Sequence, residues 1–243
     1  MNDSIGDWAC FSELRMLMAG TCVLLAVATY LAASPTAFAN QGFFPNCVRE
    51  TDSSSSFDGA QNENISGVTG ATAEIGSDNP IICNQFPRGS ASAWSMLDRG
   101  PEYAQVGWTR DYSMNTPEWF DETDDANAHV VIVYLGFFTV GSTHTYKVTY
   151  NSGSFNFYVD GSWLDGRPQD WSPQGVEFMG EAHDTADQMP GGYSAYIYFT
   201  SVEYLQGHTW SGGNLTAVDD FPNSAEWWPG GLSFGIYDTL YSS

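Results

Sequence analysis

The clearest structural signal in this sequence is a pair of alternating segments separated by a short polar turn. Large apolar or aromatic side chains recur at every second position in residues 143–150 and again in residues 155–159. A period of two places those side chains on one face of a β-strand. The linker Asn151-Ser152-Gly153 has the composition of a hairpin turn. The two segments therefore predict an antiparallel β-hairpin, whose apolar face must be covered by another layer.

Much of the remaining chain continues this pattern. Residues 103–109 and 175–181 alternate, residues 195–204 and 232–237 are aromatic and β-branched, and residues 91–97 are consistent with the start of a strand. No convincing amphipathic helix follows residue 39. Frequent Gly and Asn turns, together with 13 Tyr and 9 Trp, favour an all-β domain. We expect two antiparallel sheets stacked as a β-sandwich.

Three segments have weaker patterns. Residues 68–75 alternate weakly, which predicts an edge strand. Residues 130–140 form a near-continuous apolar run, which predicts a buried strand or two short ones. Residues 40–65 are polar and turn-rich, which predicts a surface segment held near Cys47.

The first forty residues have the pattern of a secretory signal peptide. An apolar run covers residues 14–33, Ala37-Phe38-Ala39 is a small-x-small cleavage site, and Asn40 is the expected mature start. A membrane anchor is the alternative, because the run approaches spanning length. We expect a secreted, extracellular protein with a signal peptide (1–39), a polar N-terminal segment (40–89) and a sandwich domain (90–243, with strands from about residue 66).

The net charge limits the possible partners, and the cysteines bear on a disulfide and on metal binding. Residues 1–39 contain three acids and one base, so 26 acids and 6 bases remain, a net charge of −20. Such a surface disfavours nucleic acid and anionic membranes, and it suits an extracellular protein that works in acid or salt. Cys47 and Cys83 form an even pair in an exported chain, which predicts a disulfide. No further ligands stand at zinc-like spacing, and we expect no metal or other cofactor.

Two polar residues stand on strands whose opposite faces are apolar. Gln105 alternates with Ala104 and Val106, and Glu181 lies on the face opposite Phe178. A glutamine amide can donate a hydrogen bond to a developing oxyanion. A glutamate whose pKa is raised by partial burial can deprotonate a water and later protonate a leaving amine. The pair predicts amide hydrolysis in acid, whereas a solvated strand residue is the alternative for Glu181. His183 lies two residues further on and could tune the site.

Four short motifs resemble those of the glutamic peptidases of the eqolisin family. In chain order they are a Q-x-G strand, an aromatic-acidic segment, an E-x-x-x-E strand and the strand that follows it (YAQVGW, 103–108; PEWFD, 117–121; VEFMGE, 176–181; FTSVEY, 199–204). The sequence departs from the family pattern at Phe178, where Trp is usual, and at Gly180, where a larger residue is usual.

The resemblance implies a concanavalin A-like jelly roll that hydrolyses polypeptides. By position, Gln105 would stabilise the oxyanion and Glu181 would be the general base and acid. We expect four neighbouring side chains to bind substrate: Trp108, Glu118, Trp119 and Glu177. The neprosin type of glutamic peptidase uses two Glu residues on a similar sandwich. In that version Glu122 or Glu177 would partner Glu181.

Two other functions compete with peptide hydrolysis. Exposed tryptophans on a sandwich can stack sugars, which predicts a lectin-like, glycan-binding module; the candidates are Trp108, Trp119, Trp163, Trp171, Trp210, Trp227 and Trp228. A surface or matrix protein with neither activity is the third possibility. In each case we expect a monomer that is not attached to a membrane once the signal peptide is removed.

Overall fold

The structure is a computed structural model, and it describes Cys47 and residues 55–83, 89–125, 129–192, 195–220, 224–227 and 232–239. All of these belong to one compact unit, Phe44–Ser243. The signal peptide expected at residues 1–39 and the mature start expected at Asn40 lie outside the described residues. Within the described ranges, no helix is long and apolar enough to cross a membrane.

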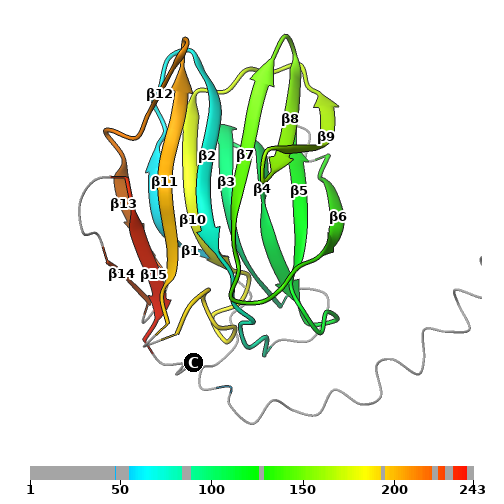
Figure 1. The fold of residues 1–243 in the computed structure, drawn as a ribbon, viewed down its shortest axis with the longest axis vertical. Helices are drawn as coiled ribbons and strands as arrows, with labels where there is room; N and C mark the ends of the chain where they lie inside the picture. Colours follow the sequence, from blue (N-terminus) through cyan, green and yellow to red (C-terminus); the bar gives the residue numbers. More distant parts are fainter. Residues whose placement is uncertain are drawn as a thin grey trace, which may run out of the picture. The chain divides into compact units, whose positions relative to one another are not determined.

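The described residues form two sheets of antiparallel strands and no helix (Figure 1). The seven-stranded sheet has the order β13 (Thr216–Asp219), β1 (Ser56–Asn62), β10 (Gly175–Ala182), β3 (Ser90–Arg99), β4 (Glu102–Asp111), β5 (Glu118–Asp124) and β6 (Val131–Phe137).

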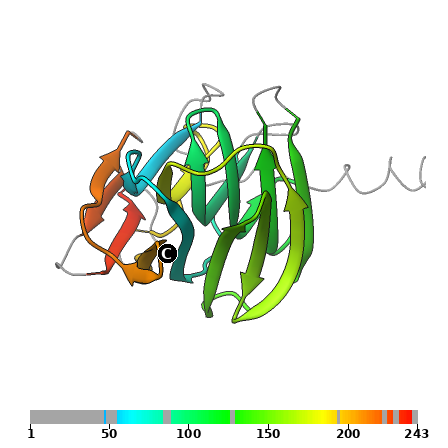
Figure 2. The same cartoon turned by 90° about the horizontal axis from the view of Figure 1, so that it is seen from above.

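The second sheet has eight strands among the described residues and lies face to face with the first (Figure 2). Its order is β14 (Ser224–Trp227), β15 (Phe234–Asp238), β11 (Ile197–Gln206), β2 (Val68–Gly76), β7 (Thr143–Asn151), β8 (Ser154–Val159) and β9 (Ser162–Pro168), and β12 (Thr209–Ser211) pairs with β11. This arrangement confirms the predicted all-β sandwich.

Alternation along the strands builds the core between the sheets. On β4, Ala104, Val106 and Trp108 are fully buried and belong to the main hydrophobic cluster. Phe178 of β10 and Phe199 of β11 meet there from the two sheets. Burying a large apolar side chain stabilises the fold by roughly 1.5–3 kcal/mol, so these faces are fixed inward. The intervening residues of β4 and β10 must then face away from the sandwich.

The predicted hairpin is present as β7 and β8. Tyr146 pairs with Val159 and Val148 with Phe157. Ser152 and Gly153 both have positive φ, 50° and 82°, as a two-residue type I′ turn requires. The serine-glycine pair therefore fixes the register that the alternation indicated.

Three predicted elements differ in place or burial. β2 lies between β11 and β7, so it is an inner strand and not an edge. β1 occupies part of the segment that the sequence predicted as surface chain, and it pairs along its whole length with β10. β6 is an exposed edge strand, where the sequence predicted a buried one. The polar composition around β1 predicted exposure, and the apolar composition of β6 predicted burial. Both predictions were wrong because burial depends on which strands become neighbours.

The expected disulfide is confirmed. Cys47 and Cys83 are bonded, with their Cα atoms 5.8 Å apart. Cys83 N–H donates to Asp187 Oδ1 at 2.6 Å. The bridge thus lies against the loop that follows β10.

Candidate active site

Cross-strand pairing arranges the central part of the outer face of the seven-stranded sheet into three rows of side chains. The Gln105 row contains Gln61, Glu177, Met96, Gln105, Glu122 and Ile132. The middle row contains Val218, Gly59, Met179, Trp94, Gly107, Phe120 and Tyr134. The Glu181 row contains Phe57, Glu181, Ser92, Thr109, Glu118 and Phe137. Polar rows therefore flank an apolar middle row.

The middle row forms the floor between the two polar rows. Trp94, Phe120 and Met179 are buried and form a cluster of their own on this outer face. Gly107 belongs to the same row, and a Cβ atom there would stand 2.1 Å from the carbonyl oxygen of Ala93. Only glycine allows β3 and β4 to approach so closely. Packing of β3 against β4 thus explains the glycine of the Q-x-G motif, whatever the chemical role of Gln105.

Gln105 and Glu181 line the same cavity, which has a volume of about 490 Å³. They come from β4 and β10 of one sheet, with β3 between them. A second cavity of about 230 Å³ also contains both residues in its wall. The structure therefore brings together the two residues that the sequence proposed as a pair.

Glu181 is a buried carboxylate that receives hydrogen bonds on both oxygens. Ser92 Oγ and Trp94 Nε1 donate to Oε2 at 3.3 and 3.2 Å, and His183 Nε2 lies 2.8 Å from Oε1. Burial raises the pKa of Glu181, but the His183 hydrogen bond and charge, with the Trp94 and Ser92 bonds, bring that pKa below its usual value. The residue pattern predicted a raised pKa for Glu181. The difference arises because donors from β3 and from the end of β10 stabilise the anion.

His183 forms an ion pair with Glu181 at the mouth of the site. Its side chain is 45 % exposed, whereas that of Glu181 is 11 % exposed. The hydrogen bond to Glu181 raises the pKa of His183, burial opposes this, and the charges of Glu181, Glu122 and Asp187 add to it. The imidazolium is thus the cation that offsets the surrounding carboxylates.

Gln105 is oriented by Glu122, its neighbour on β5. The Gln105 amide Nε2 donates to Glu122 Oε2 at 2.8 Å, and Tyr103 Oη donates to Oε1 at 2.8 Å. Because an amide nitrogen carries two hydrogens, one N–H of Gln105 can still be donated to a ligand. Burial raises the pKa of Glu122, although bonds from Tyr103 and Gln105 oppose it. Glu122 and Glu181 therefore have pKa values shifted in opposite directions.

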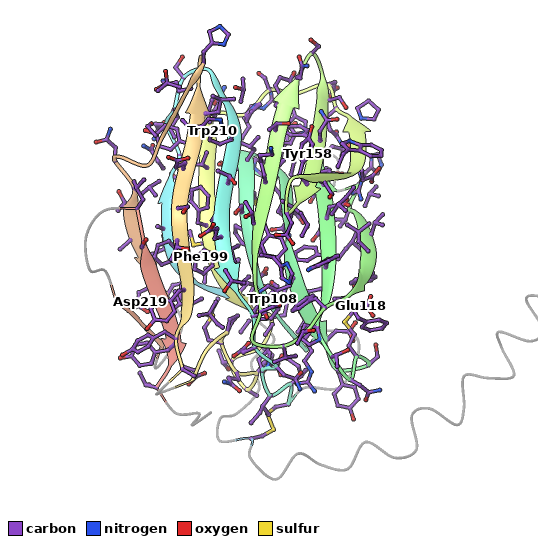
Figure 3. The ribbon with its side chains drawn as sticks, in the orientation of Figure 1. Trp108, Glu118, Tyr158, Phe199, Trp210 and Asp219 are labelled. Carbon is purple, nitrogen blue, oxygen red and sulfur yellow. A yellow bond between two sulfur atoms is a disulfide. The ribbon has the colours of Figure 1, made fainter. Side chains whose placement is uncertain are left out.

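Glu177 and Glu118 also lie on the outer face. Glu177 lines the 490 Å³ cavity, and its burial, together with the Asp98 charge, raises its pKa to about 8. It is therefore uncharged in acid and can donate a hydrogen bond. Glu118, labelled in Figure 3, lies at the start of β5 and lines another cavity of about 470 Å³.

The two tryptophans named as substrate contacts point the other way. Trp108 is fully buried in the core, and its Nε1 donates to the carbonyl of Gly76. Trp119 packs against the same core and stacks on Phe138, with ring centroids 6.0 Å apart. Both alternate with outer-face residues, so they lie away from the cavities. Their predicted role as substrate contacts is therefore wrong.

Three of the groups that hydrogen-bond to Glu181 and Glu122 were not predicted from the sequence. Ser92 and Trp94 lie on β3 between the proposed residues, and Tyr103 lies two positions before Gln105. The alternation in residues 91–97 places Ser92, Trp94 and Met96 on one face, which was the available signal. Among the residues that the structure describes, no group of three or more His, Cys, Asp or Glu is placed to hold a metal ion.

Comparison with known proteins identifies the fold. No protein-family model and no curated protein matches the sequence. Two similar solved structures are a scytalido-glutamic peptidase with a transition state analog inhibitor, at a TM-score of 0.56, and SCP-B, a member of the eqolisin family with the tripeptide Ala-Ile-His, at 0.54. Each is 12 % identical, and each match covers 78 % of this chain and 100 % of the other. The chain therefore has the β-sandwich fold seen in eqolisin-type glutamic peptidases.

Proposed function

We propose that this protein is a secreted acid endopeptidase that hydrolyses peptide bonds with Gln105 and Glu181. The observation that carries the proposal is that these two side chains line one cavity on one sheet, with Glu181 held as an anion. The similar structures bind a transition state analog and a tripeptide, which supports a polypeptide as the substrate here. We propose that the protein acts as a monomer.

In the proposed reaction Glu181 acts as general base and then as general acid. It takes a proton from a water molecule, whose oxygen attacks the carbonyl carbon of the scissile bond. The free N–H of Gln105 donates to the oxyanion that forms on the carbonyl oxygen. When the C–N bond breaks, protonated Glu181 gives its proton to the leaving amine. The ionised state of Glu181 supplies the base without any change of protonation before substrate binds.

Glu122 acts on this reaction through charge. Its carboxyl group accepts a hydrogen bond from the amide of Gln105. An ionised Glu122 therefore places negative charge beside the developing oxyanion. A protonated Glu122 removes that repulsion. Since its pKa is raised, Glu122 remains protonated to a higher pH than a free glutamate. The arrangement therefore favours catalysis in acid.

Digestion of denatured casein from pH 2 to 8 tests the proposal. Activity requires ionised Glu181, which is present above its lowered pKa and is lost as the pH falls through it. Activity also requires neutral Glu122, which is lost as the pH rises through its raised pKa. We expect a bell-shaped profile with its maximum between these two limits. A purified protein that leaves casein intact at every pH would contradict the proposed function.

Replacing His183 by Asn should move the whole profile to higher pH. Without the imidazolium, burial of Glu181 is less opposed, so the pKa of Glu181 should rise and the acidic limb of the pH profile should move to higher pH with it. The His183 charge also lowers the pKa of Glu122, so the alkaline limb should rise by a smaller amount. His208→Asn, an exposed histidine between β11 and β12, is the matched control. If the acidic and alkaline limbs of the pH profile stay in place in the His183→Asn protein, His183 does not control the pKa values of Glu181 and Glu122.

The glycan-binding alternative has less support. Trp108 and Trp171 are buried in the core, and Trp119 packs against it. Trp163 is 59 % exposed, but it lies on β9 in the other sheet. Within the described residues, the candidate tryptophans do not line the outer-face cavities.

A further inference from the structure

β6 exposes apolar side chains at the edge of the sheet that holds the candidate active site. Ile132, Tyr134 and Phe137 are 40 %, 47 % and 67 % exposed. The strand has the sequence VIVYLGF and contains no charged residue, in a chain whose formal net charge is −22. An exposed apolar edge strand favours association with other polypeptides and is usually protected by charge or proline. The exposed, uncharged apolar surface of β6 therefore indicates a binding partner.

These three side chains continue the rows of the candidate active site. Ile132 pairs with Glu122, Tyr134 with Phe120 and Phe137 with Glu118. Each therefore lies on the outer face, beside a residue of the Gln105 row, the middle row or the Glu181 row. We call Ile132, Tyr134 and Phe137 the β6 apolar strip.

A bulge in β6 determines which residues belong to this strip. The register shifts between the Gly136 and Tyr134 pairs, so Leu135 has no partner on β5. Strict alternation after Tyr134 would place Gly136 on the outer face and Phe137 on the inner one. The extra residue turns Phe137 outward instead, and Gly136 has the positive φ of 124° that accompanies the bend. The bulge thus adds an aromatic ring to the outer face.

The strip is continuous with the site. Ile132 and Tyr134 line the 230 Å³ cavity together with Gln105, Glu122 and Glu181. Tyr134 and Phe137 line the adjoining cavity of about 470 Å³, which also contains Glu118. Because Tyr134 lines both of these cavities, an extended ligand bound at Glu181 can pass over Tyr134 to Phe137.

We propose that the β6 apolar strip binds apolar side chains of an extended polypeptide substrate, about three residues from the scissile bond. Two strand spacings of about 4.8 Å separate β4 from β6, and an extended residue spans about 3.3 Å, which sets that number. This inference rests on the proposed peptidase function and names its preferred substrates. They are unfolded chains with Leu, Ile, Phe or Tyr at that distance, and without acidic residues there, because Glu118 and Asp111 border the strip.

An extended substrate fits the strip better than a second copy of the protein does. A stable dimer buries about 800 Å² on each partner, far more than three half-exposed side chains offer. The side chains also project over the outer face toward the cavities, and pairing of two sheet edges would leave that direction open. An extended chain that crosses the outer face covers them while it reaches Gln105 and Glu181.

The test compares pairs of quenched fluorogenic peptides that share the residues around the cleaved bond. One member of each pair has Leu at the third and fourth positions from that bond, and the other has Ser, in separate series for the two sides. We expect kcat/KM to favour Leu about tenfold on one side, as expected for partial burial of an apolar side chain. In the Ile132→Ser/Tyr134→Ser/Phe137→Ser protein the Leu/Ser ratio should fall close to one.

The matched control is Trp163→Ser/Tyr198→Ser, which removes two exposed aromatic residues from the other sheet and should retain the preference. Equal kcat/KM for Leu and Ser peptides in the unmodified protein overturns the proposal, as does an equal loss of preference in the control. If the unmodified protein cleaves no peptide, the proposed function fails. Fluorescence polarisation then decides the inference: tighter binding of Leu peptides to unmodified protein, lost in the triple variant, supports it, and equal binding refutes it. Sedimentation that finds a dimer dissociated by the triple substitution also overturns it.

Discussion

The Glu181→Gln protein is expected to lose hydrolysis by a factor on the order of 10³ or more, because the base that activates water is gone. A glutamine side chain has nearly the same shape as glutamate but cannot accept the proton. The Ser92 and Trp94 donors can still bond its amide oxygen in the position of Oε2. The expected change therefore falls on kcat, while substrate binding is largely preserved.

The measurement is casein digestion by both proteins at the pH optimum, with thermal unfolding followed by circular dichroism. The substitution removes the ion pair with His183, but it also removes the cost of burying a charge, so we expect a small shift in Tm. Glu203→Gln on β11, in the other sheet, is the matched control and should keep full activity. A Glu181→Gln protein that is folded and still digests casein at a near-normal rate would exclude Glu181 as the base.

The sequence was sufficient to predict the fold class because several strands carry their own evidence. Alternation places Ala104, Val106 and Trp108 on one face of a strand and Gln105 on the other, since a period of two leaves no other choice. The prediction of Trp108 as a substrate contact was wrong because it set this alternation aside. The hairpin turn at Ser152-Gly153 was equally local, because a tight turn with positive φ is encoded by the residues that form it. Features decided within ten residues of chain could thus be predicted without knowing the neighbours of any strand.

The supporting groups of the site could not be predicted in the same way. Glu181 lies 89 residues after Ser92 and 87 after Trp94, and their contact depends on the register between β10 and β3. The direction of the Glu181 pKa was predicted wrongly because the His183 hydrogen bond and charge, with smaller contributions from the Trp94 and Ser92 bonds, outweigh burial. The exposure of β6 was missed for a related reason. An apolar run indicates a strand, but only the strand order shows that β6 has a neighbour on one side.

The remaining question in the site is whether Gln105 or Glu122 assists Glu181, and substitution of each residue separates the two mechanisms. With Gln105 as the oxyanion donor, Gln105→Ala should lower kcat by about 10²–10³-fold with little change in KM. It should also shift the alkaline limb upward, because the bond from Gln105 lowers the pKa of Glu122.

Glu122→Gln should have a much smaller effect if Gln105 is the partner. The new amide oxygen can still accept the bond from Gln105 Nε2, and the neutral side chain mimics the protonated state of Glu122. We expect kcat in acid to fall by less than about tenfold, because one hydrogen bond is rearranged and none is removed. The alkaline limb should move to higher pH, since no carboxylate forms beside the oxyanion. If Glu122 is instead the second catalytic carboxylate, as in the neprosin type, Glu122→Gln should be as inactive as Glu181→Gln. Gln105→Ala would then be the milder variant, so the rank order of the two kcat values at the pH optimum decides between a Gln/Glu and a Glu/Glu mechanism.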